Sequence, residues 1–205
     1  MSYKILIFDF DGTIADTKKQ WYSSIIKVLK KEKIYCPACE AKVIMHFGKK
    51  IPEILEAIEI NKEEANKISE EIHKEFYKQF SKVNLCPGFE DLKSMNVKKI
   101  ILSNATIGAI RGVLRTKEQL FDEVYGAENF DNKKDMIKRI AQRHKVSLSE
   151  VVYIGDRAGD AKVAREAGCV GVIVSNKYSW NSRNEVIKEN PDFLVKNLKD
   201  IQKLL

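Results

Sequence analysis

Residues 3–13 read YKILIFDFDGT, an apolar run that ends in two aspartates and a glycine. A run this rich in Ile and Phe is typical of a buried strand in a parallel sheet. Asp9 and Asp11 follow it, and residues i and i+2 of an extended segment point the same way, so both carboxylates can face one pocket. Gly12 then lets the backbone turn away sharply. Because open α/β sheets bind ligands at the carboxyl ends of their strands, the sequence places a candidate site here. An acidic turn without chemistry is the alternative.

Clustered carboxylates repel one another unless a cation joins them. Oxygen ligands suit a hard cation such as Mg²⁺, which normally keeps several waters and bridges to a substrate phosphate. We therefore expect Mg²⁺ beside Asp9 and Asp11.

A second apolar run, residues 97–102, leads into Ser103-Asn104-Ala105-Thr106. These polar side chains open the next predicted helix, where backbone N–H groups favour an anion. Ser103 is therefore a candidate donor to phosphate. Alternatively, its hydroxyl only caps the helix that begins near Thr106.

Lys133 stands at the start of another predicted helix, whose apolar face comprises Met136, Ile137, Ile140 and Ala141. A cation at this end opposes the helix dipole, which favours acidic residues there. This unusual position makes Lys133 a candidate site residue. A solvated lysine is the alternative on a chain this rich in lysine.

The fourth segment is a predicted strand over residues 151–154, followed by GDRAGD at 155–160 and a helix that ends at Gly168. Asp156 and Asp160 can both reach one cation. In the alternative interpretation, Asp156 caps the helix and Asp160 is an acid of its first turn, which complements the dipole.

Taken together, these segments resemble the four motifs of the haloacid dehalogenase superfamily, in its phosphoglycolate phosphatase-like and β-phosphoglucomutase-like branch. The likeness covers nearly the whole chain. The residues that carry it are Asp9, Asp11, Ser103, Lys133, Asp156 and Asp160. The resemblance implies an α/β fold: a doubly wound, Rossmann-like parallel sheet with an inserted small α-helical cap domain. The residues independently favour a parallel sheet with the site at its carboxyl edge.

The resemblance also implies a catalytic role for each of these motif residues. Asp9 is the expected nucleophile, which forms an aspartyl-phosphate, and Asp11 is the expected general acid and then base. Ser103 and Lys133 are expected to hold phosphate oxygens. An acid at Asp11 disfavours carbon–halogen cleavage, because the dehalogenase branch lacks one there.

The remaining implied contacts concern the substrate and the metal. The expected metal ligands are Asp9, Asp11, Asp156 and Asp160, and the expected substrate contacts in the core are Phe10, Gly12, Thr13 and Asn104.

Two positions depart from the family pattern. Arg157 follows Asp156 where relatives often carry a small residue, and Lys134 stands where relatives often have proline. The spacing to Ile137 agrees with the family pattern for Lys133, so Lys133 rather than Lys134 is the expected motif lysine.

Residues 18–84 carry no strand signals and are expected to form helices throughout. The sequence thus predicts a discontinuous core of residues 1–17 and 85–205, with residues 18–84 as the cap. A break between cap helices carries Lys49 and Lys50, which we expect to contact the substrate. Two solvated lysines at a helix end are the alternative.

Composition excludes several classes of protein. The chain has 205 residues, 44% of them hydrophobic, and a net charge of +7. Within residues 18–84 Lys and Glu alternate, whereas nucleic-acid binding usually needs a concentrated basic stripe, so we expect no nucleic-acid partner. No apolar segment approaches the roughly 20 residues of a membrane span, and no signal peptide is evident. We therefore expect a cytoplasmic enzyme with no membrane contact, as a monomer or homodimer.

Cys36-Pro37-Ala38-Cys39 has the spacing of zinc sites and thioredoxin-like centres. No second pair completes four zinc ligands, and the strand expected before a redox motif is absent. The sequence instead predicts that Pro37 begins a helix and that both thiols stay reduced.

Three functions remain open. The first is a Mg²⁺-dependent phosphatase for a small phosphorylated metabolite, with 2-phosphoglycolate the first candidate by resemblance. The second is a phosphoryl-transfer isomerase of the β-phosphoglucomutase type, and the third is a non-catalytic binding or regulatory protein with the same fold.

Overall fold

The computed structural model describes residues 3–205, and the chain divides into two compact units. One unit comprises the segment up to Asp16 together with Asn84–Leu205, and the other is Thr17–Val83. Among the described residues, no helix is long and apolar enough to cross a membrane.

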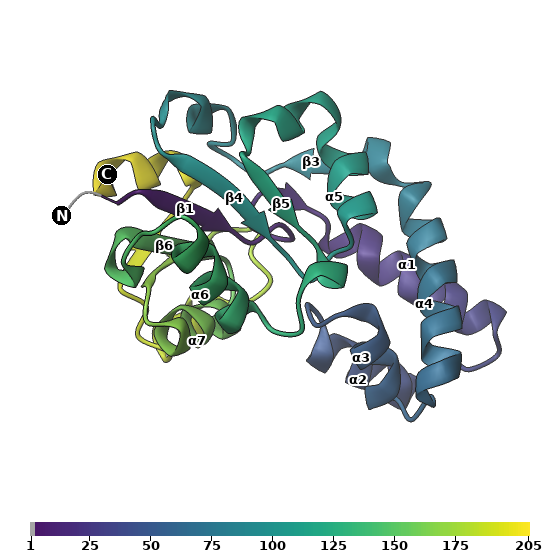
Figure 1. Cartoon of the computed structure of the whole chain (residues 1–205). Coiled ribbons are helices and arrows are strands. Elements are labelled where there is room, and N and C mark those ends of the chain that lie inside the picture. The colour runs from purple at the N-terminus through teal and green to yellow at the C-terminus, as the bar shows by residue number, and fades with distance from the viewer. Residues whose placement is uncertain (1–2) are drawn as a thin grey trace. The chain divides into compact units, whose positions relative to one another are not determined.

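The first unit is built on a six-stranded sheet (Figure 1). Its strands pair in the order β5-β4-β1-β6-β7-β8, and every pairing is parallel. The strands are β1 (Ile5–Phe8), β4 (Lys98–Leu102), β5 (Glu123–Tyr125), β6 (Val151–Gly155), β7 (Val170–Val174) and β8 (Phe193–Val195). The chain builds outward from β1 on one side and then crosses to β6 on the other, so the strand order reverses beside β1. Loops diverge at such a switch point and leave a crevice at the carboxyl ends of the strands.

Helices fill the connections between these strands. They are α5 (Ile107–Leu114), α6 (Lys133–Arg143), α7 (Ala158–Ala167) and α8 (Arg183–Ile187). Shorter 3₁₀ turns cover Glu90–Ser94, Arg115–Leu120, Ala127–Asn129, Leu148–Glu150 and Leu198–Leu204. A two-stranded antiparallel ladder, β2 (Ala15–Asp16) with β3 (Asn84–Leu85), completes this unit. The predicted α/β doubly wound sheet is thereby confirmed.

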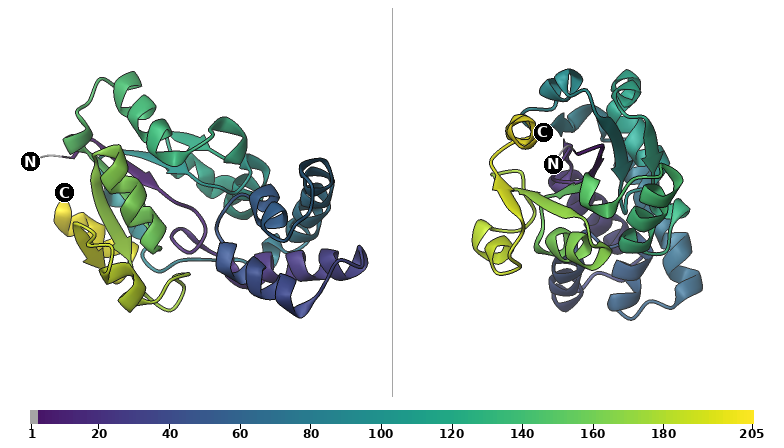
Figure 2. Two further views of the ribbon diagram at one scale, coloured as in Figure 1. Left: turned by 90° about the horizontal axis from the view of Figure 1, so that it is seen from below. Right: turned by 60° about the vertical axis from the view of Figure 1, so that its left-hand side comes forward.

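One face of the sheet is packed by α6 and α7. Side chains at alternate positions of β1 and β6, such as Ile7 and Tyr153, join Ile137 and Ile140 of α6 in a fully buried cluster. Figure 2 shows from two further directions that α7 lies against β6 and β7. This packing fixes the first turns of α6 and α7 at the carboxyl edge of the sheet.

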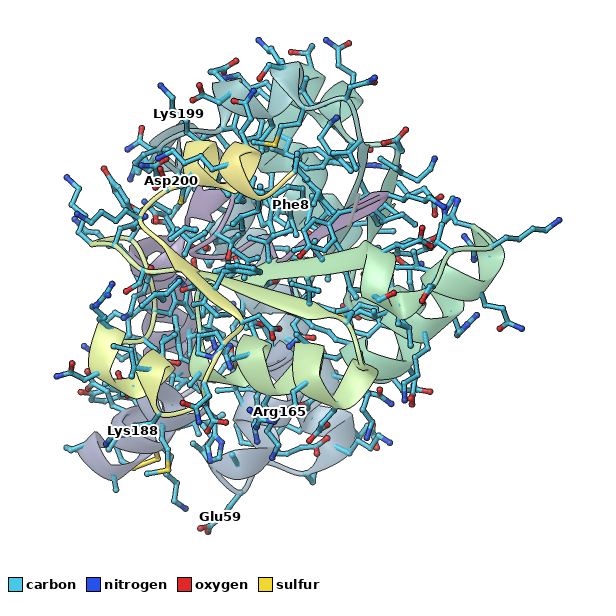
Figure 3. The ribbon with its side chains drawn as sticks, turned by 90° about the vertical axis from the view of Figure 1, so that its left-hand side faces the viewer. Phe8, Glu59, Arg165, Lys188, Lys199 and Asp200 are labelled. Carbon is cyan, nitrogen blue, oxygen red and sulfur yellow. A yellow bond between two sulfur atoms is a disulfide. The ribbon has the colours of Figure 1, made fainter. Side chains whose placement is uncertain are left out.

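The opposite face carries the other alternate side chains. Phe8 is fully buried there, and its ring meets that of Phe121 edge-on at 6.0 Å between centroids. Arg165, Lys188 and Lys199 instead project from the surface of this unit (Figure 3). The central strand therefore lies wholly in apolar surroundings, and its polar residues begin only where it ends.

The second unit is helical throughout. Its helices are α1 (Lys18–Lys31), α2 (Pro37–His46), α3 (Ile51–Ala57) and α4 (Lys62–Tyr77), with a 3₁₀ turn at Phe80–Lys82. Trp21 of α1 stacks on Phe76 of α4 with 3.7 Å between ring centroids. The helices α1 and α4 each bury one apolar face, and they pack on each other. That this unit serves as a cap remains a prediction.

The Cys-x-x-Cys segment differs from expectation in one respect. Pro37 does occupy the first turn of α2, with Cys36 as the residue before it. However, Cys36 and Cys39 form a disulfide, so the prediction of two reduced thiols is wrong. The first turn of the helix brings residues i and i+3 to one side, which the spacing alone permits but does not require. Cys86 and Cys169 are free and buried.

Candidate active site

The loop after β1 places Asp9 at the switch point of the sheet. The Asp9 N–H donates to the carbonyl oxygen of Ile154 at 2.7 Å, so pairing with β6 continues one residue beyond the strand. The Asp9 side chain is 5% exposed, and its Oδ1 accepts the N–H of Phe10 at 2.8 Å. The Asp9 backbone is thus anchored to β6, and its carboxylate to the N–H group of the next residue.

Two further aspartates come from the segment between β6 and α7. Asp156 follows β6 directly, and Asp160 lies in the first turn of α7. Asp160 Oδ2 accepts the N–H groups of Asp156 at 3.2 Å and Arg157 at 3.0 Å. A Cβ on Gly155 would lie 2.4 Å from the Asp160 carboxyl group, so glycine allows this close approach. Asp156 is therefore not the helix cap; Asp160 satisfies the backbone donors of this turn.

Lys133 reaches these carboxylates from the first position of α6. Asn132 caps that helix by accepting the N–H of Asp135, which satisfies a donor that a lysine cannot. Lys133 Nζ lies 3.0 Å from Asp9 Oδ2 and 3.6 Å from Asp160 Oδ1. Lys134 points elsewhere, with Nζ 3.8 Å from Glu166. The structure brings Lys133, and not Lys134, to Asp9.

The three aspartates form one buried cluster. Asp9, Asp156 and Asp160 each offer an oxygen, and these oxygens all lie within 4.8 Å of one another. Burial raises the pKa of Asp9, against the opposing effect of Lys133. Burial and the nearby Asp160 raise the pKa of Asp156 well above its ordinary value.

This donor set fits a divalent cation. Three buried carboxyl groups lie beside Lys133, and burial raises the pKa of Asp9 and of Asp156, so a bound cation would offset the cost of their buried charge. Carboxylate oxygens are the ligands that hard divalent ions take in proteins. A Cβ on Gly12 would lie 2.4 Å from Asp156 Oδ2, so the loop after β1 is shaped to approach this carboxylate closely.

The four residues that follow Asp9 differ in burial and in hydrogen bonding. Asp11 is half-buried and its backbone bridges to Ala15, while Phe10 is fully buried. The N–H of Gly12 donates to the Ala15 carbonyl at 2.8 Å. Thr13 is buried, and its hydroxyl lies 3.4 Å from Asp156 Oδ1. The structure therefore joins Thr13 to a predicted metal ligand. Substrate contact by Phe10, Gly12 and Thr13 stays a prediction, as do the catalytic and metal-binding roles of Asp11.

Ser103 follows β4, the neighbour of β1, and is 1% exposed. Its hydroxyl oxygen accepts the N–H of Ala105 at 3.2 Å. Thr106 is the residue that caps α5, by accepting the N–H of Ala109. The alternative in which Ser103 caps this helix is therefore wrong. Ser103 and the half-buried Asn104 lie at the same edge of the sheet as Asp9.

Lys49 and Lys50 belong to the helical unit. Lys50 immediately precedes α3, and Lys49 is exposed beside Gly48. Their contact with substrate stays a prediction.

Arg157 is surrounded by the same carboxylates. Burial lowers the pKa of its guanidinium, but Asp160, Asp9 and Asp156 together outweigh burial and raise it. Arg157 therefore remains charged and adds a second cation to this edge of the sheet.

Sequence reasoning missed two residues of the site. The backbone N–H of Trp180, in the loop after β7, donates to Asp156 Oδ2. The Tyr153 hydroxyl accepts from Lys133 Nζ at 2.7 Å and donates to Asp160 Oδ1 at 3.1 Å. A signal existed for Tyr153, because a tyrosine inside an otherwise apolar buried strand needs a partner for its hydroxyl. Nothing in the local sequence marks Trp180.

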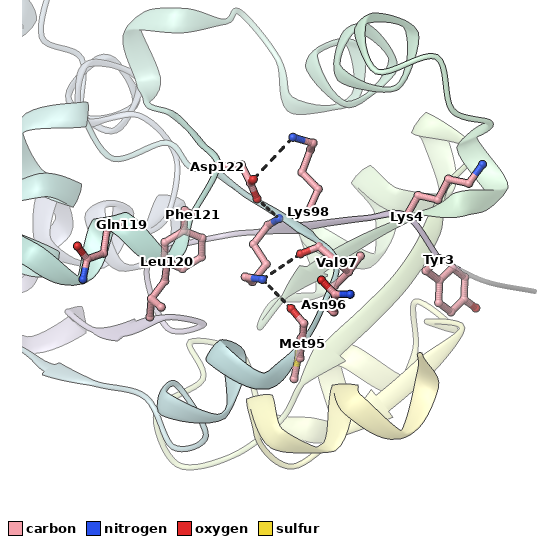
Figure 4. A pocket seen from close by; sticks show the side chains of 11 residues that line it. Tyr3, Lys4, Met95, Asn96, Val97, Lys98, Gln119, Leu120, Phe121 and Asp122 are labelled. Atoms are coloured by element: carbon pink, nitrogen blue, oxygen red, sulfur yellow. Dashed lines mark hydrogen bonds and ion pairs between the residues drawn. The ribbon is translucent and has the colours of Figure 1, made fainter.

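A separate cavity of about 600 Å³ lies at the other end of the strands (Figure 4). Its lining residues lie just before β1 and β5 and before and at the start of β4, so the cavity is at the amino ends of these strands. Its lysines are engaged locally: Lys98 pairs with Asp122, and Lys99 Nζ donates to the Met95 and Val97 carbonyl oxygens. This cavity offers none of the acidic cluster's chemistry.

Comparisons with known proteins agree with this geometry. The family model described as haloacid dehalogenase-like hydrolase matches residues 6–174. A protein of Caldanaerobacter subterraneus subsp. tengcongensis, named as a candidate pyrophosphatase PpaX, is 25% identical over 100% of this chain and 96% of its own. The phosphoglycolate phosphatase of Vibrio cholerae is 24% identical over 94% of this chain and 92% of its own.

Solved structures show the same fold. A candidate haloacid dehalogenase-like hydrolase from Bacteroides fragilis superposes with a TM-score of 0.84 at 22% identity, covering 98% of this chain and 100% of that one. CbbY from Rhodobacter sphaeroides, solved in complex with phosphate, gives a TM-score of 0.80 at 15% identity, covering 97% and 96%.

Proposed function

Because the chain belongs to the haloacid dehalogenase-like hydrolases, as an enzyme of the phosphatase type, we propose that it hydrolyses a small phosphorylated metabolite through an aspartyl-phosphate on Asp9. One observation carries this proposal. Lys133 Nζ lies 3.0 Å from Asp9 Oδ2 inside a buried cluster of three carboxylates, at the switch point of the sheet. In this proposal Asp9 is the nucleophile, Lys133 is the phosphate-binding cation and the three carboxylates bind the metal.

In the first step, an Asp9 carboxylate oxygen attacks phosphorus, and the bond from phosphorus to the leaving oxygen breaks. Asp11, as a carboxylic acid, gives its proton to that oxygen. In the second step, Asp11 takes a proton from water as the water oxygen attacks phosphorus, and the bond to Asp9 breaks to release inorganic phosphate. Proton transfer of this kind contributes roughly 10²- to 10⁴-fold.

Lys133 and Ser103 are assigned to the phosphate oxygens. Two N–H groups of the Lys133 ammonium are directed at Asp9 and Tyr153, and we assign the third to a phosphate oxygen. Backbone N–H groups near Phe10, Gly12, Thr13 and Asn104 are assigned to the remaining oxygens. In the structure, the Phe10 and Gly12 N–H groups bond to Asp9 and Ala15, so substrate binding would exchange these bonds.

We assign the cation to Mg²⁺, held by Asp9, Asp156 and Asp160 together with Asp11. When bound, Mg²⁺ neutralises carboxylate charge and lets an anionic phosphate approach an anionic nucleophile. The buried position of these residues makes that neutralisation larger than it would be in water.

We propose 2-phosphoglycolate as the first candidate substrate. The Vibrio cholerae relative supports it by name, and the pyrophosphatase name of the other relative makes inorganic pyrophosphate the second compound to test. Substrate choice is assigned to the helical unit as a cap, with Lys49 and Lys50 as contacts. Replacing both lysines with alanine should raise KM, and an unchanged KM and kcat on the true substrate would remove them from the site.

The test is phosphate release from p-nitrophenyl phosphate, 2-phosphoglycolate, pyrophosphate and β-glucose 1-phosphate, with Mg²⁺ or with EDTA. Mg²⁺-dependent release that ranks one metabolite above the others supports a phosphatase. Isomerisation of β-glucose 1-phosphate without phosphate release would instead indicate the mutase, and no turnover of any compound would favour a binding protein.

A further inference from the structure

The Tyr153 hydroxyl connects the two helices that carry the site. Tyr153 lies in β6, is fully buried, and packs its ring in the apolar cluster with Ile137 and Ile140 of α6. Its hydroxyl accepts from Lys133 Nζ at 2.7 Å and donates to Asp160 Oδ1 at 3.1 Å. Lys133 begins α6 and Asp160 lies in the first turn of α7, so one oxygen atom of the sheet ties both helix starts together.

Two carboxylates compete for the Lys133 ammonium. Its Nζ is at hydrogen-bond distance from Asp9 Oδ2, 3.0 Å, but 3.6 Å from Asp160 Oδ1. Opposite charges attract strongly in a buried, weakly screening environment, so a direct pair with Asp160 would draw the lysine away from Asp9. The Tyr153 hydroxyl lies beside Lys133 Nζ and Asp160 Oδ1 and bonds to both.

A phenol suits this place because it can donate and accept at once. In the structure the Tyr153 hydroxyl directs its proton to Asp160 and a lone pair to Lys133.

We propose that Tyr153 is a positioning residue: its hydroxyl bonds to Lys133 and to Asp160, and so keeps Lys133 at hydrogen-bond distance from the nucleophile Asp9 rather than from Asp160. Tyr153 touches neither substrate nor phosphorus and acts through the lysine. The inference rests on the proposed function, in which Lys133 serves Asp9 and the phosphate.

The first test is Tyr153→Phe, which removes one oxygen and keeps the buried ring. We expect kcat on the best substrate to fall about 10- to 100-fold, the range typical of residues that orient catalytic groups, with a smaller change in KM. Tyr125→Phe is the matched control, because the Tyr125 hydroxyl also bonds to an acid and a cation, Glu123 and Arg143, but in β5. This control should keep kcat within twofold of the parent.

A purely structural role for Tyr153 would predict something different. Tyr153→Phe would then lower the melting temperature while the folded enzyme kept its kcat and KM. An unchanged kcat in the folded variant overturns the proposal.

The second test asks whether Tyr153 acts through Lys133. In a double-mutant cycle, Tyr153→Phe should lower kcat in the parent but cause no further fall in the Lys133→Met background. Equal falls in both backgrounds overturn the proposal, because the effect of Tyr153 would then be independent of the lysine.

A crystal structure of the parent with Mg²⁺ and tungstate keeps the proposal testable if Tyr153→Phe does not fold. Lys133 Nζ should then bond to both the Tyr153 hydroxyl and the Asp9 carboxylate. A lysine paired with Asp160 instead would overturn the inference. A parent protein that releases no phosphate would contradict the proposed function. The distances from Lys133 Nζ to Tyr153, Asp9 and Asp160 would still test the role of Tyr153.

Discussion

A Cβ atom placed on Gly12 would lie 2.4 Å from Asp156 Oδ2 and 2.7 Å from Cδ1 of Trp180. Gly12 also has a φ of +77°, a left-handed conformation that other residues adopt at a cost. The loop after β1 thus approaches Asp156, at the end of β6, more closely at Gly12 than a side chain would allow. The fit is both a backbone requirement and a means of bringing Asp156 to the nucleophile.

Gly12→Ala should therefore destabilise the protein by about 1 to 3 kcal/mol and lower kcat/KM at least about tenfold. The added methyl group must displace the Asp156 carboxylate or the Trp180 ring. Urea unfolding and steady-state kinetics measure the two effects.

Gly159→Ala is the matched control. Gly159 lies in α7, and the nearest atom to an added Cβ is the flexible Arg157 Nη2 at 3.4 Å. This change should be neutral or stabilise by about 0.5 to 1 kcal/mol. Equal behaviour of the two variants would show that the close approach at Gly12 has no special importance.

Lys133→Met should lower kcat about 10²- to 10³-fold, the usual effect of removing one donor to a developing phosphate charge. Lys134→Met should change kcat less than twofold, because Lys134 Nζ lies 3.8 Å from Glu166 and away from Asp9. Steady-state kinetics on the best substrate compare the two. A larger loss at Lys134 would mean that the motif lysine has been assigned to the wrong position.

The stability of the metal-free protein should depend on pH through Asp156. Its pKa is raised in the folded state, chiefly by burial, so the folded protein holds a proton that the unfolded chain releases. The resulting penalty is absent below the unfolded pKa of about 4 and grows as pH rises toward the folded pKa. In EDTA, Asp156→Asn should consequently be more stable than the parent at pH 7, and this difference in stability should disappear near pH 4.

Mg²⁺ should reverse this order. It should raise the melting temperature of the parent by binding the folded state, and raise that of Asp156→Asn much less. Thermal unfolding across pH, with EDTA or Mg²⁺, measures both effects. A parent that is more stable than the variant at pH 7 in EDTA would show that the buried charge carries no penalty.

The disulfide between Cys36 and Cys39 predicts a thiol count. The sequence contains four cysteines, of which Cys86 and Cys169 are free, so protein denatured without reductant should expose two reactive thiols and, after reduction, four. Titration with a chromogenic disulfide reagent gives the count. Four thiols before reduction would restore the expectation of reduced cysteines.

The fold was predictable because its information is local. Apolar runs at 5–8 and 151–155 mark central strands, and a polar residue directly after each one marks the edge where a parallel sheet binds ligands. The spacing of Asp156 and Asp160 on a strand–helix turn likewise permits both to reach one place. The catalytic roles of these residues remain predictions.

The contacts of Trp180 and Tyr153 could not be predicted, because they depend on tertiary packing. Trp180 reaches Asp156 from a loop 24 residues further along the chain, and no pattern in that loop predicts the contact. Tyr153 bonds to Lys133 only because α6 packs over β6. The disulfide was missed because Cys-x-x-Cys spacing permits a bridge in the first turn of a helix without requiring one.

The central claim is that Asp9 forms a phosphoenzyme, and trapping it is the most direct test. Asp11→Asn should slow its hydrolysis, since Asp11 activates the water. This variant would be mixed with Mg²⁺ and the best substrate, quenched, and reduced with borohydride, which converts an acyl phosphate to an alcohol. Mass spectrometry of the peptide containing Asp9 should then show homoserine at position 9, only when substrate and Mg²⁺ were both present. Homoserine at another aspartate, or none in an enzyme that still releases phosphate, would contradict the account.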